Sequence, residues 1–293
     1  MGYLYITIAV VLFSIQFLFT KKYQQAAGDS VKSAFLSNAV APVGFVIIFF
    51  FLDGMKIQAT PFALILAFIS ALVCNFCTYY SIKALALGSL TNYSLWLMSG
   101  GMLLPVLYGG IFENDAFGVA KIIGILMVCA AVIVKMDFKE KTDWKTLLCF
   151  IALFILNGLV GVISSIYQSQ QITFEKVSST QFSILSGLMR IAVGGIVFAF
   201  LTIKNKESEE EKTLHDYVKA SPWAAIQGVC NGVANLLLLF ALLTIEPSLQ
   251  YPMVTGGCIF LSAIIGLFFK EKLSKRAWIA VALAMLGTIV MIF

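Results

Sequence analysis

The stretch "SLQYPMVTGGCIFLSAIIGLFF" (residues 248–269) decides the fold, because it contains no charged residue. A helix that crosses roughly 30 Å of hydrocarbon needs about 20 predominantly apolar residues, and this stretch is long enough by itself. The whole chain of 293 residues is 60% hydrophobic and only 12% charged. Soluble domains of this size carry more charge, so the sequence predicts an all-α integral membrane protein.

Comparable apolar stretches recur along nearly the whole chain, and long irregular segments are almost absent between them, as expected where lipid cannot satisfy the backbone. Residues 204–221 form the longest aqueous segment. They mix both charges, contain His215 and are predicted to be a solvated cytoplasmic loop with room for a short surface helix. No signal peptide is predicted, because the first stretch lacks a preceding basic segment. The ten expected transmembrane helices are residues 3–20, 32–52, 62–82, 89–112, 117–135, 146–172, 179–203, 222–244, 248–269 and 276–293.

The basic residues predict how these helices are oriented in the membrane. All but four of the 20 Lys and Arg residues follow odd-numbered predicted helices, and the exceptions are Lys56, Lys121, Lys176 and Arg190. Cytoplasmic loops carry the excess of Lys and Arg in membrane proteins. The count therefore places both termini outside the cytoplasm.

The order of features in residues 61–135 recurs in residues 222–293. "PFALILAFISALVCN" and "PWAAIQGVCNGVANL" each place a proline at the start of a predicted helix, and "GSLTNYSLWLMSGG" then matches "PSLQYPMVTGG". Two halves of five helices must face opposite ways in the membrane, because five is odd. The sequence therefore predicts two inverted five-helix repeats, residues 1–140 and 141–293, a build typical of secondary transporters with a site between the halves.

Three motifs near the end of the chain carry a family resemblance. They are "PSLQYP" (residues 247–252), Gly256-Gly257 with the later Gly287, and "KEKLS" (residues 270–274). These residues are similar to the S-x-x-Y-P motif, the glycine-rich helix and the E-[KR]-[LP]-[ST] turn of the drug/metabolite transporter superfamily, in its ten-helix branch. The resemblance implies alternating access around a midplane site, in the plasma membrane of a prokaryote. Many members have cytoplasmic termini, so the orientation stays open between that pattern and the Lys and Arg count.

Polar side chains recur at helical spacing inside the predicted helices. Gln227, Asn231 and Asn235 share one helical face, and the repeat-related Ser70 and Cys74 form a milder version of it. Interhelical polar pairs contribute only about 0.6 kcal/mol on average, so lining a cavity is a better reason for so many of them than cohesion. The residues predicted to bind substrate are Asn92, Trp96, Asn157, Arg190, Gln227, Asn231, Asn235, Tyr251 and Thr255.

Arg190 lies in the middle of the apolar run from residue 179 to residue 203. A charge at the bilayer centre costs roughly 2.5–3.5 kcal/mol on insertion scales, so this arginine needs a partner or a purpose. Two interpretations stay open. Arg190 bonds to carbonyls or amides of neighbouring helices, or it reaches the cavity and binds a carboxylate or phosphate with its planar fork of donors.

Several classes of function are disfavoured by what the sequence lacks. No predicted helix holds an Asp or Glu near its middle, which argues against proton-coupled export of bulky cations. Metalloprotease, hydrolase and nucleotide-binding motifs are absent, so no enzymatic activity, ATP-driven transport, cofactor or nucleic-acid partner is expected. Cys74-x-x-Cys77 has the spacing of a metal or redox motif but lacks a second ligand pair, and helix packing is expected for it instead.

The sequence therefore predicts a secondary active transporter of a small polar metabolite, amino-acid-like or another small carboxylate. Organic-cation transport on aromatic faces, and a membrane scaffold or sensor that moves nothing, stay open as alternatives. Expected partners are the substrate, the lipid bilayer and a coupling ion or proton. Gly228-x-x-x-Gly232 is predicted to pack helices closely, and Ala280-x-x-x-Ala284 either does the same or forms the seam of a homodimer.

Overall fold

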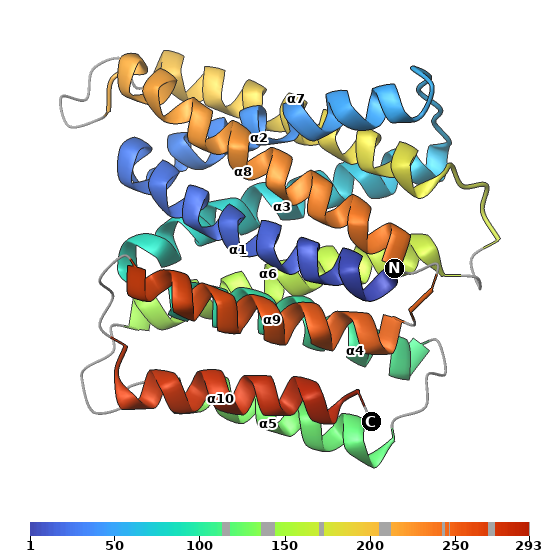
Figure 1. Ribbon diagram of the computed structural model, residues 1–293. Helices are drawn as coiled ribbons and strands as arrows, with labels where there is room; N and C mark the ends of the chain where they lie inside the picture. Colours follow the sequence, from blue (N-terminus) through green and yellow to red (C-terminus); the bar gives the residue numbers. More distant parts are fainter. Residues whose placement is uncertain are drawn as a thin grey trace.

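The computed structural model describes residues 1–112, 118–135, 144–169, 173–204, 212–241, 244–245, 247–268 and 273–292. Within these ranges the chain forms helices and no strand, which confirms the all-α prediction and the count of ten (Figure 1). The helices are α1 (Gly2–Ala27), α2 (Val31–Leu52), α3 (Pro61–Leu87), α4 (Leu90–Phe112), α5 (Val119–Lys135), α6 (Trp144–Gln168), α7 (Ser179–Lys204), α8 (Leu214–Ala241), α9 (Pro247–Phe268) and α10 (Lys275–Val290).

Seven of these helices are long and apolar enough to cross a bilayer: α1, α2, α3, α4, α6, α7 and the Gln250–Phe268 part of α9. Helix α5 is also apolar but shorter, with 17 residues. Large apolar side chains lie exposed along these helices, as expected where lipid replaces water as the solvent. The protein is therefore a multi-pass membrane protein.

The start of α8 differs from the prediction. The helix begins at Leu214 and runs through Pro222, so residues 214–221, where the sequence left room for a short surface helix, form one continuous helix with the segment predicted from residue 222. Thr213 and Asp216 bond reciprocally, since each backbone N–H donates to the other side chain at 3.0 and 3.3 Å, which caps the helix. Tyr217 and Ala220 are fully buried against neighbouring helices, and this packing extends the helix beyond its apolar run.

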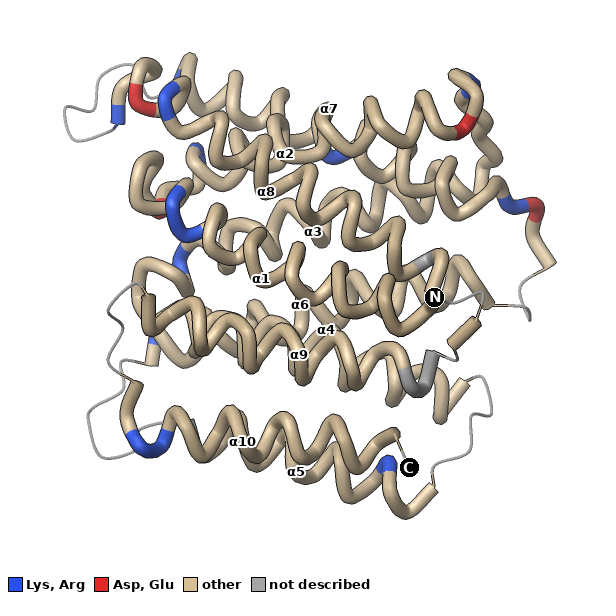
Figure 2. The backbone as a smooth tube through the Cα atoms, in the orientation of Figure 1, with Lys and Arg blue, Asp and Glu red and all other residues tan. Residues whose placement is uncertain are grey.

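Two ends of the helix bundle can be distinguished. Most described Lys and Arg residues gather at the end where α1 finishes and α2 begins, and we call this the lysine-rich end (Figure 2). Both termini lie at the opposite end, which we call the terminal end (Figure 1). The sequence-based sorting of basic residues into two sides agrees with this arrangement, while the side that faces the cytoplasm stays a prediction.

The contacts between helices stay nearly the same when α1 is exchanged with α6, α2 with α7, and so on through α5 and α10. Helix α2 packs against α7, α4 against α9 and α5 against α10. Helix α1 packs on α8 and α9, and α6 packs on α3 and α4 in the same way. The pair α5 and α10 lies at one edge of the molecule, so the other eight helices enclose its centre (Figure 1).

Glycines set the closest helix crossings. A Cβ atom added at Gly228 of α8 would overlap the carbonyl oxygen of Ala41 in α2, and one added at Gly232 would overlap Phe45. The predicted close packing at this glycine pair is therefore confirmed. Ala280 and Ala284 are completely buried inside the chain against neighbouring helices, so this pair cannot form the seam of a homodimer.

Candidate functional site

A cavity of about 400 Å³ lies between α1–α4 and α6–α9, and no described residue of α5 or α10 lines it. Pockets for small molecules usually measure about 300–1,000 Å³, so this one suits a small metabolite. Of the nine residues predicted to bind substrate, seven line the cavity: Asn157, Arg190, Gln227, Asn231, Asn235, Tyr251 and Thr255.

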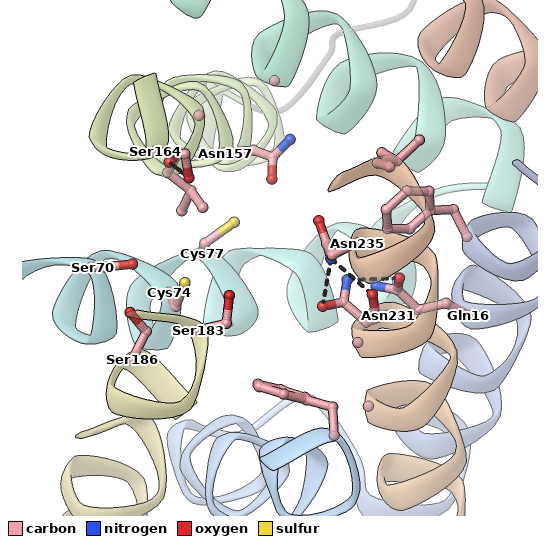
Figure 3. Close-up of a pocket in the computed structure, with 18 of the residues that line it drawn as sticks. Gln16, Ser70, Cys74, Cys77, Asn157, Ser164, Ser183, Ser186, Asn231 and Asn235 are labelled. Atoms are coloured by element: carbon pink, nitrogen blue, oxygen red, sulfur yellow. Dashed lines mark hydrogen bonds between the residues drawn. The ribbon is translucent and has the colours of Figure 1, made fainter. Parts of the chain in front are cut away.

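One side of the cavity is built from side-chain amides of α1 and α8, namely Gln16, Gln227, Asn231 and Asn235, which we call the amide wall. The Asn231 Nδ2 group donates to Gln16 Oε1 at 2.9 Å, and Asn235 Nδ2 donates to the backbone oxygen of Asn231 at 2.8 Å (Figure 3). Gln16 is absent from the predicted set. Its helical spacing with Phe13 and Thr20, which also line the cavity, is the sequence signal that could have found it.

The side facing the amide wall carries hydroxyl and thiol groups from α3, α6 and α7 (Figure 3). Ser70 and Cys74 on this side occupy the positions that the sequence repeat relates to Asn231 and Asn235. Helices α3 and α6 on this side thus correspond to α8 and α1 of the amide wall under the exchange of helices five positions apart. We call this side the hydroxyl wall, and its members are Ser70, Cys74, Cys77, Ser164, Ser183 and Ser186.

Arg190 bonds to an amide of a neighbouring helix, as the first interpretation predicts, and it also lies in the cavity lining, while anion binding stays a prediction. Its Nη2 group donates to Asn38 Oδ1 at 2.9 Å, and Thr78 Oγ1 donates to the same oxygen at 3.1 Å. Asn38 is fully buried, and its own Nδ2 donates to the backbone oxygen of Ala34 at 3.3 Å, which leaves its oxygen as the acceptor. Arg190 therefore joins α7 to α2, and Asn38 connects this pair to α3 through Thr78, while Arg190 also lines the cavity.

The charge of Arg190 has no carboxylate opposite it among the described residues that line the cavity. The Nε atom of the guanidinium is buried and bonds to no group in the described parts of the chain. An uncompensated cation within a membrane protein is costly, and a bound anion is the simplest compensation. The cavity is therefore electropositive at this point and otherwise neutral.

Asn92 and Trp96 do not line the cavity, which corrects two of the nine predicted positions. Trp96 is buried and packs against Phe150 and Phe154 of α6, with ring centroids 5.8 and 6.3 Å apart. Tyr93, one position after Asn92, faces the cavity instead. The repeat alignment needs gaps in this segment, and an error of one residue rotates the assigned face of a helix by 100°.

The cavity is closed towards the lysine-rich end and open towards the terminal end. Thr20 and Tyr93, its lining residues nearest the lysine-rich end, are each 2% exposed, and Tyr23 behind them is fully buried. Towards the terminal end the lining includes Asn235 and Gln168, and both of these side chains are exposed. Solutes therefore reach the amide wall from one end only in this conformation.

The two ends also carry corresponding tyrosine contacts. Near the end of α1, Tyr23 donates its hydroxyl to the backbone oxygen of Ser33 at 2.6 Å. Near the end of α6, Tyr167 donates to the backbone oxygen of Val177 at 2.7 Å, also ten residues further along the chain. Each tyrosine belongs to a buried cluster that includes two alanines of the other predicted half, Ala220 and Ala224 with Tyr23, and Ala63 and Ala67 with Tyr167.

Comparisons with known proteins give a partial match. No family model matches the chain. A segment of 69 residues, 24% of this chain, is 35% identical to proteins of Yersinia pestis (strain Pestoides F) and Yersinia pseudotuberculosis serotype O:3 (strain YPIII). Both are described as "Probable 4-amino-4-deoxy-L-arabinose-phosphoundecaprenol flippase subunit ArnE", and the match spans 60% of their length, less than two thirds.

A solved structure described only as "Crystal structure of protein" has the same fold. It superposes with a TM-score of 0.63 over 99% of this chain and 95% of its own chain, at 15% sequence identity. The likeness therefore extends to all ten helices and concerns the fold alone.

Proposed function

We propose that this chain is a secondary transporter of the drug/metabolite transporter superfamily, in its ten-helix branch, and is not an enzyme. It moves a small polar metabolite that carries a carboxylate, amino-acid-like or similar, across the plasma membrane by alternating access. The observation that carries the proposal is a central cavity with two neutral polar walls, one uncompensated arginine and an opening to one end only.

The helix pairing supports an alternating mechanism. Exchange of each helix with the one five positions later preserves the main contacts, and the Tyr23 and Tyr167 contacts follow the same exchange. This is the relation expected of two inverted halves, residues 1–140 and 141–293. In a protein made of two inverted halves, the conformation that is open to the opposite side forms when each half adopts the conformation of the other.

The membrane relatives favour a second candidate, in which the cargo is a lipid-linked sugar phosphate. The two Yersinia proteins are described as flippase subunits for an arabinose derivative on phosphoundecaprenol. Arg190 would bind a phosphodiester as readily as a carboxylate. Organic cations fit less well, because the guanidinium repels them and no described lining residue is an Asp or Glu.

Labelling of Cys74 tests the alternating mechanism. This thiol lines the cavity and is half-buried, so a membrane-impermeant thiol reagent applied at the terminal end is expected to react with it. The same reagent applied at the lysine-rich end is expected to react at least about tenfold more slowly, because buried residues close that end. Labelling is measured by mass shift in sided membrane vesicles.

The control is Cys74→Ser, which removes the labelled thiol and leaves the more buried Cys77 in place. A carboxylate substrate is expected to slow labelling from the terminal end and to speed it from the lysine-rich end, since it allows the halves to exchange. Equal labelling of Cys74 from both ends without substrate would show a channel and contradict alternating access.

A further inference from the structure

Four buried polar atoms of side chains that line the cavity have no protein partner among the described residues: Ser186 Oγ, Arg190 Nε, Gln227 Oε1 and Gln250 Oε1. Two of them, on Arg190 and Gln227, differ in kind. The Nε atom of Arg190 is a donor on a charged group, while Gln227 Oε1 is a neutral acceptor. Neither atom finds a partner among the residues that the structure describes, and Gln227 is only 8% exposed. A buried polar atom left unpaired is costly, so such an atom in a cavity wall indicates a group that a ligand supplies.

Arg190 lies on the α7 flank of α2. Gly187 of α7 faces Val46 and the ring of Phe45, and Gly194 faces the backbone of α2 from Phe35 to Ala39. Arg190 lies between these two glycines in sequence, and its guanidinium bonds to Asn38. It therefore sits beside the middle of α2, between the levels of Asn38 and Phe45.

Gln227 lies on the opposite flank, at the same level. Gly228 of α8 abuts Ala41 of α2, and Gly232 abuts Phe45. Gln227 directly precedes Gly228, so it sits beside Ala41. The part of α2 that faces the cavity between the two flanks is apolar, because Ala41 and Phe45 line it.

A ligand that satisfies both groups needs an anion at one end, a hydrogen-bond donor at the other and an apolar spacer across Ala41 and Phe45. The amino and carboxylate groups of an α-amino acid share one carbon, whereas a helix with its side chains is about 10–12 Å wide. The two groups of such a short unit cannot reach both flanks of α2. An extended chain with a terminal ammonium or amide can do so.

We propose that the cavity selects extended carboxylates with a donor group at the far end, such as ω-amino carboxylates. The carboxylate binds Arg190, and the distal N–H group donates to Gln227 Oε1. The claim that this ligand is transported rests on the proposed function. The claim that it binds rests on the cavity alone.

The test compares two isomers with the same atoms and charges, 4-aminobutanoate and 2-aminobutanoate, with butanoate as the compound that lacks the donor. Thermal-shift titration of the detergent-purified full chain is expected to give at least about tenfold tighter binding for the 4-amino isomer than for the 2-amino isomer. Gln227→Leu is expected to reduce the affinity for 4-aminobutanoate to that for butanoate. Cys230→Ser, on the same helix and outside the cavity lining, is the matched control and is expected to change neither affinity.

Equal or tighter binding of 2-aminobutanoate to the wild-type protein would overturn the inference, as would no binding of either isomer or an unchanged preference in Gln227→Leu. The wild-type comparison needs no variant, so a misfolded mutant cannot hide the answer. Isomer-selective binding without flux into liposomes would contradict the proposed transport alone. Flux without isomer selectivity would contradict this inference alone.

Discussion

Arg190→Gln is expected to weaken the binding of a small carboxylate by about 10- to 100-fold. Hydrogen bonds to charged groups contribute about 1.5–3 kcal/mol, and every 1.4 kcal/mol corresponds to a factor of ten. Glutamine keeps a donor that can bond to Asn38 Oδ1, so the connection between α7 and α2 is retained while the charge is lost. The measurement is a ligand titration of purified wild-type and variant proteins, followed by thermal unfolding.

Asn38→Asp supplies the sharpest control for this prediction. The new carboxylate would lie at hydrogen-bond distance from Arg190 and neutralise it within the protein, without changing the shape of the side chain. Aspartate loses the bond that Asn38 Nδ2 donates to the backbone oxygen of Ala34 but gains an ion pair with Arg190, so folding is expected to be preserved, while carboxylate binding falls as far as in Arg190→Gln. Unchanged binding in both variants would show that Arg190 only joins helices.

Gly228→Val is expected to have the largest effect on folding. Any Cβ at this position overlaps the carbonyl oxygen of Ala41, which belongs to the backbone of α2 and cannot rotate away. Helices α2 and α8 must separate to relieve the overlap, and both of them line the cavity. Overpacking typically costs about 1–3 kcal/mol, and a clash with rigid backbone is expected at or above the upper end of that range. The measurement is the yield of monodisperse protein and its unfolding temperature.

Gly195→Ala is the matched control, because it also places a methyl group on a glycine inside a long helix. Nothing lies within 4 Å of the Cβ position at Gly195, and alanine favours the helix by about 0.8–1.0 kcal/mol over glycine in soluble hosts. The unfolding temperature of Gly195→Ala is therefore expected to stay the same or rise. A folded, fully active Gly228→Val protein would contradict the tight crossing of α2 and α8.

Composition and periodicity were sufficient to predict the helices and most of the cavity. Apolar stretches of about 20 residues marked the ten elements without any tertiary information, and seven of the helices are long and apolar enough to cross a bilayer. The spacing of Gln227, Asn231 and Asn235 assigned one face of α8, and the structure turns that face to the cavity. Arg190 stood out because a mid-membrane charge needs an interior environment.

The errors arose where tertiary packing decides. Tyr217 and Ala220 are polar or small, so apolar periodicity did not mark the first turns of α8, although neighbouring helices bury them. Trp96 was assigned to the cavity from an alignment with gaps, and only the packing of α4 on α6 shows which face is turned inward. Ala280 has the same spacing in a dimer seam as in an internal crossing, so its pattern alone could not separate the two.

Counterflow in proteoliposomes tests the central claim most directly. Liposomes containing the full chain are loaded with unlabelled 4-aminobutanoate, 2-aminobutanoate or glutamine and diluted into the same compound carrying a radiolabel. A carrier that exchanges solute through a cavity open to one side at a time is expected to accumulate label transiently above equilibrium for at least one of these carboxylates, and Arg190→Gln is expected to abolish the overshoot. The absence of an overshoot for all three, in protein that still unfolds cooperatively, would contradict the transport of small carboxylates.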